Sequence, residues 1–159
     1  MPTQRQRVTV WDLAVYDREG QLILIVEFKS KLHTSPEWAA KFRRNILAHG
    51  DFPKVPYFLM VFPDKFYLWT DKEARFDESE PTYVIDASPI FQPSFEKAGI
   101  KNEQQISGES LEIIFSSWLT SIIYSPEVLN PANESQRWLI DSGLYAAIAG
   151  GSLQFEAGA

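Results

Sequence analysis

Short apolar runs separated by turn-forming residues dominate the first half of the chain, a pattern typical of β-strands. The runs 8–16 and 21–29 are rich in β-branched residues and flank the polar link 17–20, so they predict a β-hairpin. Both runs are apolar at nearly every position. We therefore expect both faces of the sheet to be covered by other parts of the protein.

A helix over 36–49 is predicted from a hydroxyl cap at 34–35, a proline suited to the first turn and apolar residues at helical spacing. The apolar run 57–62 predicts a strand, and 66–70 predicts its antiparallel neighbour. Strand, helix and strand imply a right-handed crossover between parallel strands. We expect the four strands to lie in sequence order, with the middle pair parallel and the helix on one face.

The second half begins with a charged loop over 71–81 and then becomes mainly helical. A short strand is predicted at 82–85 and a weak helix at 90–98. The clearest helical stripe covers 108–124, and a last helix is predicted over 134–149, before two glycines. These elements indicate an α/β protein, with a mixed β-sheet flanked by helices and extra helices on its C-terminal side.

The composition fits a single globular domain over 1–159, with a core at 8–70 and a loop and helical extension at 71–159. Hydrophobic residues form 45% of the chain and aromatic residues 14%, which excludes a disordered chain. The absence of cysteine excludes disulfides and thiolate zinc sites. Because no apolar run could span a membrane and the start lacks the apolar region of a signal peptide, we expect a soluble cytoplasmic protein.

Charge is distributed unevenly along the chain. Residues 1–75 contain 12 Lys and Arg against 9 Asp and Glu, whereas residues 76–159 contain 3 against 12. A polyanion is therefore attracted to the first half and repelled by the second. Since dedicated nucleic-acid binders are more basic than this, we expect nucleic-acid binding to be weak.

Two carboxylates interrupt the apolar strands of the predicted hairpin. Pairing the strands across the link 17–20 puts Asp12 opposite Ile25, and it places Asp12, Glu27 and Lys29 on one face. The other face collects the apolar residues of both strands: Trp11, Leu13, Val15, Leu22, Leu24, Val26 and Phe28.

Carboxylates in buried strands are costly unless they are paired or bind a metal. Asp12 and Glu27 provide hard oxygen ligands suited to Mg²⁺ or Mn²⁺, and Lys29 can balance charge or hold an attacking water near a phosphate. The alternative is a structural ion pair between Glu27 and Lys29, with Asp12 at a solvated edge.

The order Asp12, then Glu27-Phe28-Lys29, then helix, strand and antiparallel strand resembles the PD-(D/E)XK superfamily of restriction-endonuclease-like nucleases. The resemblance covers residues 8–70. It implies that Asp12 and Glu27 are ligands of Mg²⁺ or Mn²⁺ and that Lys29 is the catalytic lysine. It further implies hydrolysis of DNA or RNA phosphodiesters, by the protein alone or within a restriction or repair assembly.

The chain departs from the superfamily pattern in two ways. Trp11 stands where the family has proline, and the first helix and first strand of the family core have no counterpart before residue 8. Either the C-terminal helices replace these elements or the site is incomplete. A catalytically idle nuclease fold that serves as a protein-interaction module is the rival interpretation, favoured by the acidic second half and the strongly apolar helix 108–124.

Three further expectations concern binding. Lys41 and Arg44 on the helix 36–49 can contact nucleic-acid phosphates, or they can form its solvated face. Without the family's first strand, strand 8–16 should form the edge of the sheet. An apolar edge invites pairing, so we expect a homodimer, with this strand or the C-terminal helices at its interface.

Overall fold

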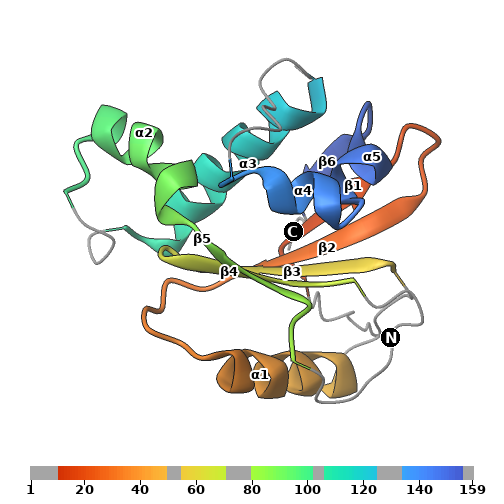
Figure 1. Cartoon of the computed structure of the whole chain (residues 1–159), viewed down its shortest axis with the longest axis horizontal. Coiled ribbons are helices and arrows are strands. Elements are labelled where there is room, and N and C mark those ends of the chain that lie inside the picture. Colours follow the sequence, from red (N-terminus) through yellow and green to blue (C-terminus); the bar gives the residue numbers. More distant parts are fainter. Residues whose placement is uncertain (1–10, 50–54, 71–79, 102–105, 125–133, 156–159) are drawn as a thin grey trace, which may run out of the picture.

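The computed structural model describes residues 11–49, 55–70, 80–101, 106–124 and 134–155. It shows a six-stranded mixed sheet with helices on both faces (Figure 1). The elements in chain order are β1 Leu13–Tyr16, β2 Leu22–Phe28, α1 Pro36–His49, β3 Tyr57–Val61, β4 Lys65–Trp69, β5 Tyr83–Asp86, α2 Ser88–Ala98, α3 Gly108–Tyr124, α4 Arg137–Asp141, α5 Leu144–Ile148 and β6 Ser152–Phe155.

The predicted α/β class and the order of the first four strands are confirmed. The strand order across the sheet is β5-β4-β3-β2-β1-β6. β2 and β3 pair in parallel, whereas β1 with β2 and β3 with β4 pair in antiparallel fashion. Helix α1 connects the parallel pair and lies alone on one face, while the later helices gather on the other (Figure 1).

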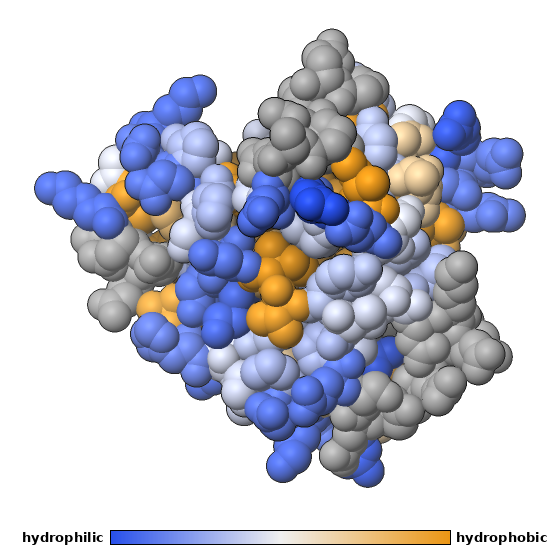
Figure 2. All heavy atoms as spheres, in the orientation of Figure 1, coloured by the Kyte–Doolittle hydropathy of each residue, from blue (hydrophilic) through white to orange (hydrophobic). Residues whose placement is uncertain are grey.

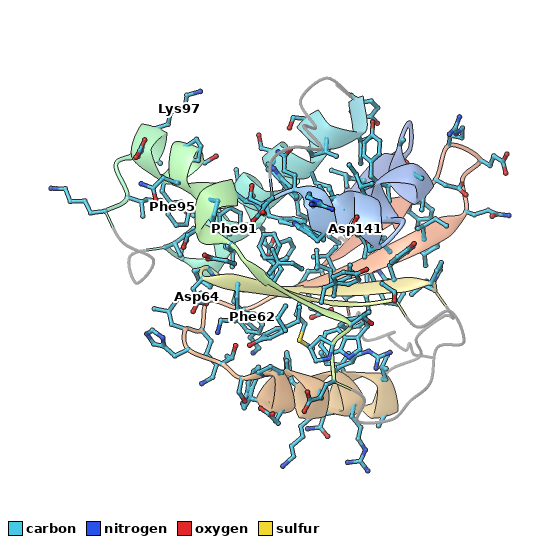
Figure 3. The ribbon with its side chains drawn as sticks, viewed as in Figure 1. Phe62, Asp64, Phe91, Phe95, Lys97 and Asp141 are labelled. Carbon is cyan, nitrogen blue, oxygen red and sulfur yellow. The ribbon has the colours of Figure 1, made fainter. Side chains whose placement is uncertain are left out.

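Each face of the sheet has its own apolar core because alternate residues of a strand point to opposite sides. Ile25 packs with Phe58 and Phe62 beneath α1, whereas Leu24 packs with Phe91 and the other helices. Figure 3 shows Phe62 on the α1 side of the sheet and Phe91 on the opposite side. The expectation that both faces are covered is therefore confirmed.

The predicted register of the hairpin is wrong by two residues. Ile25 pairs with Ala14 rather than with Asp12, and Leu13 pairs with Val26. One residue of the shift arises at the turn, where Tyr16 pairs with Leu22 rather than with Gln21. The other is an extra residue in β2, because Val15 already pairs with Leu24.

The extra residue also changes which side chains share a face. Leu22 and Trp11 pack against the core beneath α1, and Ile23 packs against the opposite core. The predicted apolar layer loses Leu22 for this reason, and it loses Trp11 because that residue lies before β1, outside the regular alternation of the strand. The other members of that layer, from Leu13 to Phe28, keep their predicted face because a shift of two residues preserves the alternation.

The prediction that the first strand forms the edge of the sheet is wrong. β6 pairs with β1 in antiparallel fashion, with Leu13 opposite Phe155 and Tyr16 opposite Ser152. The predicted last helix also divides into α4 and α5 at Gly143, which has φ 83°. The chain then turns at Gly150, with φ 77°, and enters β6.

Some expectations fall outside the described residues, namely the strand start at 8–10 and the loop at 71–79. Among the helices that the structure does describe, none has the length and apolar character needed to cross a membrane.

Candidate active site

Asp12 lies directly before β1 and is held against β2 by two hydrogen bonds. Its backbone N–H donates to the carbonyl of Val26 at 3.2 Å, and its Oδ2 accepts from the N–H of Phe28 at 2.9 Å. These two bonds place Asp12 beside the stretch of β2 that runs from Val26 to Phe28 and includes Glu27. The structure therefore brings the two carboxyl groups to one place on neighbouring strands.

Glu27 has the more unusual environment of the two acids. Burial and, second to it, the negative charge of Asp12 raise the pKa of Glu27 to about 9, against smaller opposing effects of the Asp12 N–H and the Lys29 charge. Its Oε2 atom is buried and has no hydrogen-bond partner in the described part of the chain. At neutral pH this carboxyl group is therefore protonated unless a cation takes the place of the proton.

Burial also raises the pKa of Asp12, while the N–H of Phe28 and the charge of Lys29 act in the opposite direction. Lys29 thus lies close enough to influence both acids. It is exposed at the end of β2, and its Nζ lies 5.2 Å from the centroid of the Phe42 ring on α1.

Glu112 of α3 is a site residue that the sequence analysis missed. Burial raises its pKa, and the charges of Asp12 and Glu109 add to that effect. Its charge in turn contributes to the raised pKa of Glu27. Helix α3 reaches this position because Phe115 packs edge-on against Phe28, with 5.5 Å between the ring centroids.

A weak signal for Glu112 was present in the sequence. Glu109 and Glu112 are the only charged residues in the helix 108–124, and Glu112 adjoins the buried Leu111. Periodicity alone could not show which strand this part of the helix covers. Only the docking of α3 on β2 places the third acid near the first two.

The donor set fits a divalent cation that keeps several of its own ligands. Asp12 and Glu27 offer carboxylate oxygens, which suit Mg²⁺ or Mn²⁺, and Oε2 of Glu27 is buried without a hydrogen-bond partner among the residues that the structure describes. In the part of the chain that the structure describes, no group of three Asp, Glu or His side chains has metal-ligand geometry. The residues therefore fit a two-carboxylate site completed by water or substrate oxygens.

The structure does not link the two predicted phosphate contacts to the acids. Lys41 and Arg44 are exposed on α1, and neither is among the charges that shift the pKa of Asp12 or Glu27. Their role in nucleic-acid binding stays a prediction. Arg43, also on α1, is in contrast buried, with its guanidinium group 5.2 Å from the centroid of the Trp69 ring of β4.

No family model, curated protein or solved structure matches this chain. The resemblance to the PD-(D/E)XK superfamily therefore rests on Asp12, Glu27, Lys29 and the order of the surrounding elements.

A hollow of about 300 Å³ lies away from the acids, at the β5 edge of the sheet. It lies between β5 and the start of α4, and Figure 2 shows a small apolar patch over β5 near the centre of this face. Val84, on β5, is 54% exposed here.

Proposed function

We propose that this protein is a small nuclease that hydrolyses phosphodiester bonds of DNA or RNA with Mg²⁺ or Mn²⁺. Its main support is the half-buried Glu27 beside the anchored Asp12. The Oε2 atom of Glu27 is buried and has no hydrogen-bond partner among the described residues. A buried carboxyl group with an unsatisfied oxygen is costly unless a ligand compensates it. A cation bound by Glu27 and Asp12 would provide that compensation.

Asp12 and Glu27 would hold the cation from two neighbouring strands. When bound, the cation would polarise a phosphoryl oxygen and lower the pKa of an attacking water. Lys29 contributes a positive charge beside the acids and can orient that water or stabilise the charge that develops on the phosphate. Glu112 adds negative charge from the opposite layer and can hold a water of the cation.

The direct experiment is cleavage of a single-stranded oligonucleotide and a supercoiled plasmid with Mg²⁺ or Mn²⁺. We expect weak cleavage by the wild type and none by Asp12→Ala or Lys29→Ala, because the first loses a metal ligand and the second the cationic group near the phosphate. Lys97→Ala, an exposed lysine on α2, serves as the matched control. Cleavage that persists in both site variants would come from a contaminant.

The second candidate function is a catalytically idle nuclease fold that acts as a protein-interaction module. The hollow at β5 and the exposed apolar side chains of Val84, Ile113 and Tyr124 favour it. This candidate predicts neither cleavage nor binding of a divalent cation. The same set of measurements therefore separates the two functions.

Partners and location belong to the proposal as well. The acidic second half supports weak rather than tight nucleic-acid binding, and the lack of cysteine fits the cytoplasm. A homodimer stays a prediction, but its basis moves from β1 to the outer strands β5 and β6.

A further inference from the structure

Two lysines directly after β2, separated by one residue, lie on two stacked aromatic rings of α1. Lys29 Nζ lies 5.2 Å from the centroid of Phe42, and Lys31 Nζ lies 5.5 Å from the centroid of Trp38. The two rings are stacked, with 5.1 Å between their centroids and 28° between their planes. The lysine pair therefore forms a short cationic row that begins beside the acids and leads away from them.

The row forms because the spacing of the two lysines is similar to the spacing of the two aromatic residues. Lys29 and Lys31 are two residues apart along a chain that leaves β2, a distance of at most about 7 Å. Trp38 and Phe42 are four residues apart on a helix, which is about 6 Å. Because the chain after β2 runs antiparallel to α1, the ammonium group of Lys29 can contact Phe42 and that of Lys31 can contact Trp38.

The loop that carries Lys31 is fixed to the rest of the protein by hydrogen bonds. Asp64 accepts from the N–H of His33 at 3.2 Å, and Lys65 Nζ donates to the carbonyl of Thr34 at 3.3 Å. The buried hydroxyl of Thr34 also bonds that of Tyr67 at 2.9 Å. Lys31 is therefore presented on an ordered loop, which lowers the entropy cost of binding a ligand.

Among the described residues, no carboxylate is paired with Lys31. Its contact with Trp38 is its one interaction with the described residues. The segment 28–49 contains five Lys and Arg and only one acidic residue. An exposed cation of this kind, held next to a second cation, favours a bound anion.

We propose that Lys31, seated on Trp38, binds the phosphate that adjoins the scissile phosphate of a nucleic-acid strand. The inference rests on the proposed nuclease function and names its substrate as a polymer with successive phosphodiesters. The spacing of Lys29 and Lys31 resembles the distance between neighbouring phosphates of such a strand. Lys29 would then face the reacting phosphate and Lys31 the next one along.

Fluorescence anisotropy of a labelled 12-nucleotide single strand, measured from 20 to 200 mM salt without divalent cation, tests the proposal. Lys31→Met keeps the aliphatic stem on Trp38 but removes the charge. We expect it to weaken binding about 5- to 10-fold at low salt and to reduce the salt slope by about 0.7, the value of one phosphate contact on a single strand. Lys31→Arg should retain both, because it keeps the charge and the ring contact.

Lys97→Ala removes an exposed lysine from α2, on the other side of the sheet (Figure 3), and should bind as the wild type does. Equal salt slopes for Lys31→Met and the wild type would overturn the proposal, as would a wild type that does not bind the strand. The proposal and the nuclease function fail separately. Binding with the expected change of salt slope but no cleavage in Mg²⁺ would support the phosphate contact of Lys31 and contradict the nuclease function. Cleavage with equal salt slopes would support the nuclease function and contradict the phosphate contact of Lys31.

Discussion

Glu27 is an acid in an otherwise apolar strand, and its surroundings favour the neutral carboxyl group. Burial and the charge of Asp12 raise its pKa from an ordinary 4.5 to about 9. Between these two values the unfolded chain releases the proton and the folded protein keeps it. The folded state therefore loses stability as the pH rises through this range, at no more than about 1.4 kcal/mol per pH unit.

Glu27→Gln removes the titrating group and keeps its shape. We expect its free energy of unfolding to exceed that of the wild type by an amount that grows from pH 5.5 to pH 8.5, because only the wild type has the ionisation to suppress. Urea unfolding at several pH values measures this difference. Glu37→Gln, an exposed acid on α1, is the control and should follow the wild type. Parallel curves for Glu27→Gln and the wild type would show that Glu27 is not buried as described.

Glu112 tests whether α3 contributes to the site. We expect Glu112→Gln to weaken Mn²⁺ binding about 3- to 10-fold without abolishing it, because the side chain adds negative charge near Asp12 and acts through water. Calorimetry measures the affinity. Glu109→Gln changes an exposed acid one turn earlier and should have a smaller effect. An unchanged affinity in Glu112→Gln would remove α3 from the site.

At the scale of elements, the local sequence pattern correctly predicted the helices and strands whose limits depend on nearby residues. Helix α1 begins at Pro36, after its hydroxyl cap, and α3 has the predicted limits because its apolar stripe is continuous. The parallel pairing of β2 and β3 followed from the crossover rule. These features depend on residues close together in sequence.

The elements that were missed depend on distant contacts. β6 contains four residues, Ser152–Phe155, and only its partner β1 makes it a strand. The extra residue of β2 shifted the hairpin register, although the turn residues alone did not indicate it. Gly143 interrupts the last helix at φ 83°, a break that the overall periodicity of 134–149 concealed.

Gly151 tests the pairing of β6 with β1. A Cβ at this position would overlap the carbonyl oxygen of Tyr16, which is backbone and cannot move aside alone. We expect Gly151→Ala to destabilise the protein by about 1–3 kcal/mol, the usual cost of overpacking. Gly108→Ala is the control, because a Cβ there meets nothing within 4 Å. Equal unfolding free energies of the two variants, measured in urea, would contradict the described entry into β6.

At the scale of the whole molecule, the uneven charge of the sequence becomes a difference between two faces. Helix α1 comes from the basic first half, and the helices on the opposite face come from the acidic second half (Figure 1). A polyanion would therefore approach from the α1 side, where Lys29 and Lys31 lie. The weak overall affinity expected from the net charge of −6 is compatible with this local attraction.

The predicted homodimer also belongs to this scale. β6 is an outer strand of the sheet, and its residue Phe155 is 44% exposed. If the dimer forms through this edge, Phe155→Lys should convert it to a monomer, because a lysine on an edge strand opposes pairing. Val84→Lys places the same charge on the opposite edge and should leave the dimer intact. Light scattering at micromolar concentration measures the mass, and a wild-type monomer would contradict the prediction.

The central claim is that Asp12 and Glu27 together hold one divalent cation. The most direct measurement is a Mg²⁺ titration of protein with ¹³C-labelled Asp and Glu carboxyl groups, followed by NMR at pH 7.5. We predict that the signals of Asp12 and Glu27 move together and saturate at one ion per chain, while Glu27 releases its proton to the solvent as the ion binds. In Asp12→Asn the Glu27 signal should no longer respond. Signals of both groups that stay unchanged up to tens of millimolar Mg²⁺ would contradict the account.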